Sequence, residues 1–100
     1  MKTRQNGSGG AATVKLRGRF TFETHKTFRS AFDAELAAQS DKIIIDFGAV
    51  EYIDSAALGM LLLANERAST AGKQIELANC GGSVKAVLDI ANFQKLFEIR

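Results

Sequence analysis

Proline and tryptophan are absent from this chain of 100 residues, which has one cysteine and one histidine. A single thiol excludes an intramolecular disulfide and favours a reducing compartment. One cysteine and one histidine are too few to indicate a zinc site, which needs three or four protein ligands. No apolar run approaches the ~18 residues that could span a membrane, and residues 1–12 lack the apolar segment of a secretory signal. We therefore expect a cytoplasmic protein with no membrane insertion, metal or cofactor.

The chain also has little excess charge, with 13 Lys and Arg against 11 Asp and Glu. A net charge of +2 with scattered basic residues argues against nucleic acid as a partner. The glycines at 7, 9 and 10 do not follow a strand in a dinucleotide-binding pattern, and no phosphate-binding loop motif is present. We interpret His25 as a surface residue at a helix start, which is the usual place for such a residue. Nothing in the sequence indicates that it lies near Ser55 and could serve it as a base. These absences argue against an enzyme.

Apolar periodicity predicts one α/β domain over residues 13–100, preceded by a flexible arm or short edge strand over residues 1–12. Strand-like and helix-like segments alternate in the order (β)-β-α-β-α-β-α, which predicts a mostly parallel sheet of four to five strands with packed helices. The predicted strands are 13–20, 43–47 and the segment around 75–77. Thr24 is the predicted N-cap of the first helix. The second helix spans about 55–71 and stops at Gly72. The third follows Ser83 and is expected to end at Asn92 in a left-handed conformation, before a short last helix near 93–97.

Two segments carry more specific expectations. Residues 43–47 are almost wholly apolar, which is typical of a central strand covered on both faces. In the helix that starts at Ser55, we expect Leu58, Leu61 and Leu62 to cover the sheet, and Leu63 to be core rather than surface. Met60 lies on the outer side and is the better interface candidate. Cys80 is expected to be a small buried or strand-end residue.

The pair Asp54–Ser55 is the main candidate site. An apolar strand and a short loop precede the pair, and a helix begins at it. Free N–H groups and the positive end of the helix dipole gather at such a start, so a phosphate is tolerated there. A lone hydroxyl without a base is a poor catalyst but can accept a phosphoryl group. Two plainer alternatives are a Ser55 that only caps the helix, and a Mg²⁺ site among Asp46, Glu51 and Asp54.

Residues 13–97 resemble the STAS family, in particular the single-domain anti-sigma factor antagonists of bacterial partner-switching systems. The resemblance is carried by Val14-x-Leu16-x-Gly18-Arg19-Phe20, Ile43-Ile44-Ile45-Asp46-Phe47, Ile53-Asp54-Ser55-x-x-Leu58-Gly59, Gly72-Lys73-x-Ile75-x-Leu77 and Val84-x-x-Val87-Leu88. It implies that a serine kinase of the anti-sigma factor type phosphorylates Ser55 and that a PP2C-like phosphatase removes the phosphate. It also implies a downstream effector protein and a role in signal transduction or transcription regulation.

The resemblance assigns supporting roles in the phosphosite loop to Asp54 and Gly59. Asp54, which precedes the helix, is expected to be a cap or a loop-shaping carboxylate that helps to position Ser55. Candidates for the partner interface are Tyr52, Ala56, Ala57 and Met60. Many relatives have Ser-Gly at positions 56–57, so the two alanines leave one hydroxyl in the loop and favour a stiffer helix start. Many relatives also have an acid where this chain has Thr21, so contacts of that acid are not expected here.

A different role within the same family stays open. The chain could be a STAS accessory subunit that does not switch, for example in a lipid-transport complex, or a module that binds a small ligand. The Asp54–Ser55 pair favours instead a phosphorylation-controlled binding module, which the resemblance implies. Such a module binds a partner kinase or regulator while Ser55 is unphosphorylated and releases it when Ser55 is phosphorylated.

Overall fold

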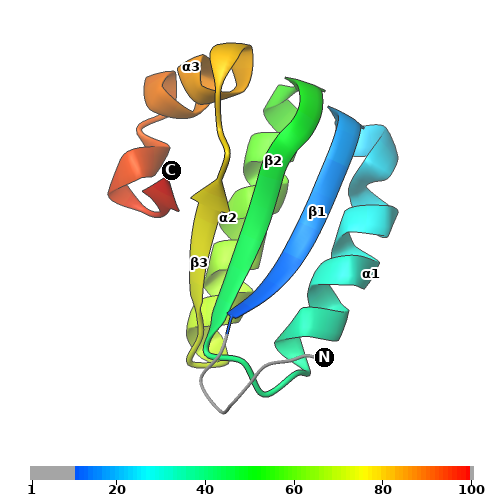
Figure 1. Ribbon diagram of the computed structural model, residues 1–100, viewed down its shortest axis with the longest axis vertical. Helices are drawn as coiled ribbons and strands as arrows, with labels where there is room; N and C mark the ends of the chain where they lie inside the picture. Colours follow the sequence, from blue (N-terminus) through cyan, green and yellow to red (C-terminus); the bar gives the residue numbers. More distant parts are fainter. Residues whose placement is uncertain (1–10, 100) are drawn as a thin grey trace.

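The computed structural model describes residues 11–99, and it confirms the predicted α/β class (Figure 1). The predicted edge strand before residue 6 lies outside the described residues. The first strand begins two residues earlier than predicted. The elements are β1 (Ala11–Phe20), the 3₁₀ turn η1 (Phe22–Thr24), α1 (His25–Leu36), β2 (Lys42–Ile53), α2 (Ser55–Thr70), β3 (Gln74–Ala78), α3 (Gly82–Ile90), the 3₁₀ turn η2 (Phe93–Lys95) and β4 (Glu98–Ile99).

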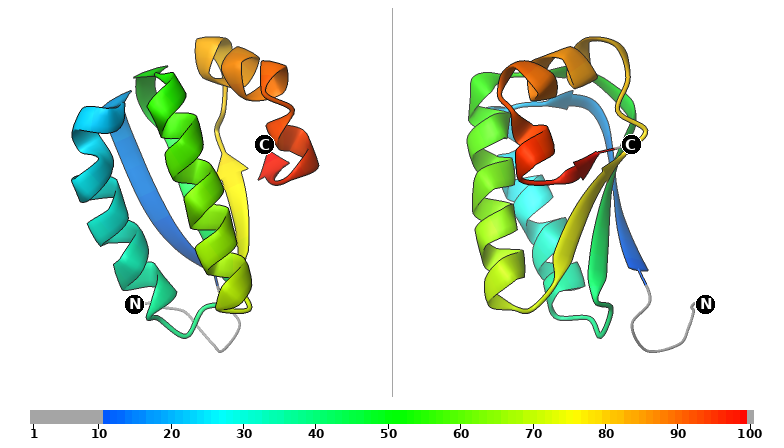
Figure 2. Two further views of the ribbon diagram at one scale, coloured as in Figure 1. Left: turned by 180° about the vertical axis from the view of Figure 1, so that it is seen from behind. Right: turned by 90° about the vertical axis from the view of Figure 1, so that its left-hand side faces the viewer.

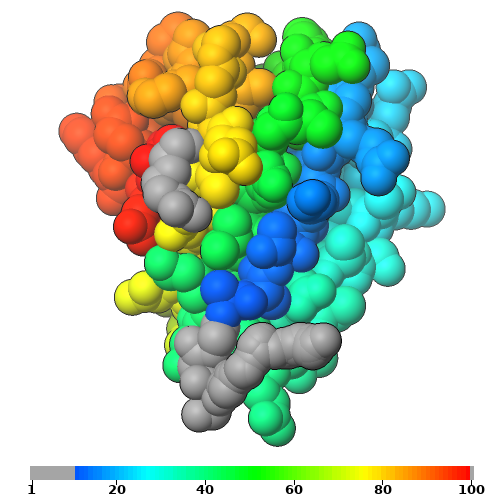
Figure 3. Space-filling model, in the orientation of Figure 1, coloured from blue at the N-terminus to red at the C-terminus, as the bar shows by residue number. Residues whose placement is uncertain are grey.

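The sheet has the order β1-β2-β3-β4, and every neighbouring pair is parallel. Each new strand is added on the same side of the previous one, and crossover connections between parallel strands are right-handed. The helices in successive connections therefore lie on the same face of the sheet. Accordingly, α1 and α2 lie side by side behind the sheet, and α3 lies at its upper end (Figures 1 and 2). No helix among the described residues covers the opposite face, which Figure 3 views. No described helix is long and apolar enough to cross a membrane.

Strand β2 corrects two expectations from the sequence. Its side chains alternate in burial, with Ile43, Ile45 and Phe47 buried and Ile44 half-buried, so the prediction of cover on both faces was wrong. The predicted loop after Phe47 is also strand. Pairing of β2 with β3 stops at Asp46, but pairing with β1 continues across two register shifts to Ile53. Residues 48–52 are not paired with β3 and are mostly exposed, so their sequence has mixed polarity. This mixed polarity is why the sequence did not predict that the strand continues.

The core lies between the sheet and the two helices. Phe20 of β1 packs against Phe28 of α1 and Phe47 of β2, with ring centroids 5.1 and 5.9 Å apart. Helix α2 turns a narrow stripe of mostly small residues inward, namely Ala57, Leu61, Ala64 and Ala68. The small side chains let the helix lie close to the sheet.

This close packing leaves two leucines of α2 outside the core. Leu62 is 43% exposed and Leu63 is 61% exposed, so the predictions that placed both inside were wrong. Leu61 is fully buried as expected, and Leu58 is half-buried against the core. The sequence could not distinguish these positions, because the first half of α2 has no polar stripe to mark the solvent side.

The ends of the elements follow local chemistry. Gly72, at φ +76°, ends α2 in a Schellman motif: Lys73 N donates to Ala68 O at 2.8 Å, and Gly72 N donates to Ser69 O at 3.0 Å. This confirms the predicted stop. Asn92 has a left-handed conformation, also as predicted, with φ 60°. The predicted last helix is only the turn η2, and the chain then adds β4 to the sheet edge.

Candidate functional site

Ser55 is the first residue of α2, at the end of the sheet where β1, β2 and the start of α1 meet (Figure 1). Asp54 precedes it in an extended conformation, and its Oδ1 accepts a hydrogen bond from Ala57 N at 2.9 Å. Asp54 is therefore the N-cap, as one of its predicted roles required. The plainer alternative, in which Ser55 itself caps the helix, is wrong. Ser55 is exposed and stands in the first turn of α2, where backbone N–H groups have no partners within the helix.

Asp54 also joins three elements. Its Oδ2 accepts a hydrogen bond from Phe22 N at 3.3 Å, and its own N–H donates to Phe20 O at 3.4 Å. The carboxylate thus ties the turn η1 to the start of α2, and the backbone N–H of the same residue ties both to the end of β1. Ser55 is consequently presented by a connected frame of backbone, and its position depends on Asp54.

The turn beside Asp54 is formed by two threonines. Thr24 Oγ1 donates to Thr21 O at 2.9 Å and accepts from Thr21 N at 3.1 Å. Thr24 holds the N-cap position of α1 as predicted, but its hydroxyl is engaged with Thr21 and does not cap that helix. Thr21 is 5% exposed, so its side chain lies beneath the surface beside Ser55 and is not part of it.

Aromatic side chains flank the site. Phe22 is 61% exposed and stacks on His25, with ring centroids 4.6 Å apart. His25 Nδ1 donates to Phe22 O at 2.6 Å in the tautomer that this contact requires. Tyr52 is 46% exposed, and the Arg19 guanidinium lies over its ring at 4.7 Å. Phe22 was missed from the sequence, since nothing in its context separates it from the core phenylalanines.

An exposed stripe runs down α2 from Ser55. Gly59, Leu62 and Leu63 follow at helical spacing, and all are exposed. A Cβ built on Gly59 would meet nothing within 4 Å, so no neighbour among residues 11–99 requires glycine there. We call Ser55, Gly59, Leu62 and Leu63 the α2 stripe.

The candidate interface residues differ in their access to solvent. Tyr52 is exposed, and Ala56 and Met60 are half-buried. Ala57 is fully buried under the cap of α2, so it cannot lie on a contact surface, and its place among the candidates was wrong. The reason is the helical period: Ala57 and Leu61 share the face that packs on the sheet.

The acidic cluster expected around Ser55 does not form. Asp46 Oδ1 accepts hydrogen bonds from Gly48 N at 2.8 Å and Asn79 Nδ2 at 2.9 Å, at the end of β3. The Asn79 and Gly48 hydrogen bonds hold the pKa of Asp46 below its ordinary value. Within residues 11–99, no three metal-ligating side chains come together, so the Mg²⁺ alternative has no support in the geometry.

Cys80 is buried after β3, as predicted. Burial raises the pKa of its thiol to about 11, and Lys85 offsets this only in part. At neutral pH the thiol is therefore protonated, which makes it a poor nucleophile.

Comparison with known proteins agrees with the fold. The family model described as "Mlab, STAS domain" matches residues 3–98. This chain belongs to the STAS domain family. A STAS-domain containing protein of Pseudomonas aeruginosa (strain UCBPP-PA14) is 41% identical over 91 residues, which cover 91% of this chain and 89% of the relative.

Two further comparisons are with proteins named as anti-sigma factor antagonists. BtrV of Bordetella bronchiseptica, described as a candidate anti-sigma factor antagonist, is 32% identical over 71 residues; the match covers 67% of this chain and 61% of BtrV. The structure of the anti-sigma factor antagonist SpoIIAA in its unphosphorylated form has a TM-score of 0.70 at 15% identity, over 96% of this chain and 84% of SpoIIAA. The STAS domain of a SulP transporter from Vibrio cholerae shares the fold as well, with a TM-score of 0.74 at 18% identity over 96% of this chain and 77% of that chain.

Proposed function

We propose that this STAS domain is a phosphorylation-controlled binding module of the anti-sigma factor antagonist type, in the cytoplasm. The observation that carries the proposal is the placement of Ser55: an exposed hydroxyl at the first position of α2, directly after the Asp54 cap. Unphosphorylated, the domain binds a partner through the α2 stripe and its surroundings. Phosphorylated, it releases that partner.

The chemistry of the α2 stripe supports release by charge. Phosphorylation adds about −1.5 to −2 charges at Ser55. The helix N-terminus tolerates that charge in the free protein. In a complex, the same charge has to be desolvated beside Gly59, Leu62 and Leu63, where no basic residue of the stripe offsets it. The switch therefore requires no change of fold.

The proposed partners follow from the family type. A serine kinase of the anti-sigma factor type would both bind the domain and phosphorylate it, and a PP2C-like phosphatase would reverse the reaction. A downstream effector is regulated by the exchange. The relatives named as anti-sigma factor antagonists support this assignment.

The second candidate is a STAS accessory subunit that does not switch. The likeness of the fold to the STAS domain of a SulP transporter fits this candidate. The two candidates differ in one measurement. A switching domain changes its partner affinity when Ser55 is phosphorylated, whereas an accessory subunit keeps its partner regardless.

Genetic encoding of phosphoserine at position 55 tests the proposal without a known kinase. Partners recovered with the unmodified domain are titrated calorimetrically against both forms. We expect the phosphorylated form to bind at least tenfold more weakly, Ser55→Ala to bind like the unmodified protein, and Ser55→Asp to weaken binding only in part. Equal affinities for phosphorylated and unmodified protein would refute the switch.

The site of modification is tested separately with the kinase and Mg-ATP, read by intact mass. Ser55→Ala should abolish phosphate incorporation. Ser69→Ala, which removes an exposed hydroxyl in the last turn of the same helix, is the matched control and should leave incorporation unchanged. Phosphate on Ser69 with Ser55 unmodified would contradict the assignment.

A further inference from the structure

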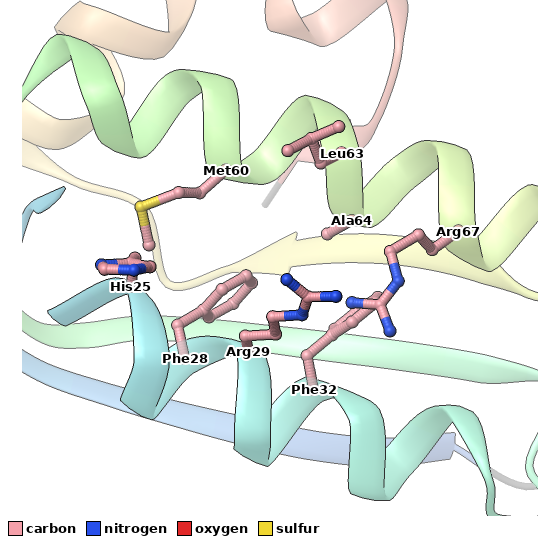
Figure 4. Close-up of a pocket in the computed structure, with 8 residues that line it drawn as sticks. All are labelled: His25, Phe28, Arg29, Phe32, Met60, Leu63, Ala64 and Arg67. Atoms are coloured by element: carbon pink, nitrogen blue, oxygen red, sulfur yellow. The ribbon is translucent and has the colours of Figure 1, made fainter.

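A groove of about 350 Å³ lies between α1 and α2, away from the sheet (Figure 4). Its floor consists of Phe28 and Phe32, which are 5% and 0% exposed. Met60 and Leu63 of α2 form the opposite wall (Figure 4). A concave, mostly apolar site of this volume is the size that small molecules occupy.

Two arginines give one end of the groove a positive charge. The guanidinium groups of Arg29 and Arg67 lie side by side between the helices (Figure 4). The Arg67 guanidinium carbon is 5.9 Å from the centre of the Phe32 ring. Both arginines share one carboxylate: Arg67 Nη2 donates to Asp33 Oδ1, and Arg29 Nε lies 3.9 Å from Asp33 Oδ2.

The charges around the two guanidinium groups do not balance. Across residues 11–99, Asp33 is the one carboxylate within ion-pair distance of either arginine. Each guanidinium carries five N–H donors, and the contacts to Asp33 use few of them. Paired guanidinium groups of this kind recognise a planar carboxylate or a phosphate through two parallel hydrogen bonds.

We propose that the groove binds an anionic amphiphile, namely a medium-chain aliphatic carboxylate or its phosphate counterpart. The head group lies between Arg29 and Arg67. The aliphatic chain lies over Phe28 and between Met60 and His25, at the other end of the groove. A folded protein partner fits less well, because a stable interface needs about 800 Å² on each side, far more than this groove offers.

Chain length and head group are tested first, by calorimetry below the micelle concentration. Hexanoate, octanoate and decanoate should bind with increasing affinity, by about three- to fourfold for each buried methylene. Decyl phosphate should bind as well, since it offers the same anionic contacts. Decanol and decyltrimethylammonium should bind at least tenfold more weakly than decanoate. Equal binding of all the decyl compounds, or no binding of decanoate, would overturn the proposal.

Matched variants locate the site. Arg29 has a side chain that is 71% exposed, so Arg29→Gln should fold normally and should weaken decanoate binding at least tenfold. Lys26→Gln removes the same charge from an exposed position of α1 outside the groove, and it should leave the affinity unchanged. An equal loss in both variants would show unspecific charge attraction and contradict the proposal.

A second pair of matched variants tests the apolar wall of the groove. Leu63→Asp should weaken decanoate binding, whereas Leu62→Asp, at the adjacent exposed position outside the groove, should not. Both proteins are checked for an unchanged fold by circular dichroism. If instead light scattering shows a dimer that Leu63→Asp dissociates, and decanoate does not bind, a second copy occupies the groove and the proposal is wrong.

Discussion

Gly59→Ala should make this protein more stable. Gly59 is the fifth residue of α2, it is exposed, and an added Cβ would meet nothing within 4 Å. Glycine in a helix interior is less favourable than alanine by about 0.8–1.0 kcal/mol, because it loses more backbone entropy on folding. With no clash to offset this, we expect a gain of about 1 kcal/mol in the free energy of unfolding. For a domain of this size, that raises Tm by about 4–8 °C.

Gly72→Ala is the matched control, because the same methyl group should act in the opposite direction there. Gly72 also has open space around it, but its φ of +76° is left-handed. A side chain in that conformation costs about 1–2 kcal/mol, so Tm should fall. Both variants are measured by urea and thermal unfolding followed by circular dichroism. If Gly59→Ala is neutral or destabilising while Gly72→Ala behaves as expected, the description of α2 as unstrained and open at Gly59 is wrong.

Partner binding provides a second measurement on Gly59→Ala. Since nothing in the part of the chain that the structure describes requires glycine at this position, its occurrence in the α2 stripe fits close approach by a partner. We expect Gly59→Ala to weaken partner binding while it stabilises the free domain. A stabilised variant with unchanged affinity would remove Gly59 from the interface.

Three further predictions concern single side chains. Asp54→Ala should lower the free energy of unfolding by about 1 kcal/mol, because the cap on Ala57 is lost; in urea titrations Asp54→Asn should retain most of it. The pKa of Asp46 is lower in the folded protein than in the unfolded chain, where it is about 3.9. Ionised Asp46 therefore stabilises the fold above that pH, and this stabilisation is lost as the pH falls through the lower pKa of the folded protein. The stability difference between wild type and Asp46→Asn should therefore shrink below about pH 4 in acid titrations, and a constant difference would contradict the assignment. Cys80, with a pKa raised to about 11, should react with a thiol reagent at pH 7.5 only after unfolding, and fast reaction of the native protein would show that the thiol is accessible.

Much of the site was predictable because it rests on local chemistry. Asp54 could be identified as a cap, because an acid before a helical run accepts the free N–H groups of the first turn. The start of α2 at Ser55 followed from the same signal. Gly72 predicted the other end of α2, since a left-handed residue is needed there. These features depend on neighbours within four residues, so the sequence contains them.

Tertiary packing decided the rest. The sequence determined the α/β order, the STAS family and the Asp54–Ser55 junction, since each is written in patterns of nearby residues. It could not show that β2 continues to Ile53, because that depends on pairing with β1 and not on its own polarity. It could not place Leu62 and Leu63 outside, because small residues on the opposite side of α2 set which face meets the sheet. The groove with its two arginines exists only because α1 and α2, far apart in the chain, pack side by side, and no local pattern determines such a contact.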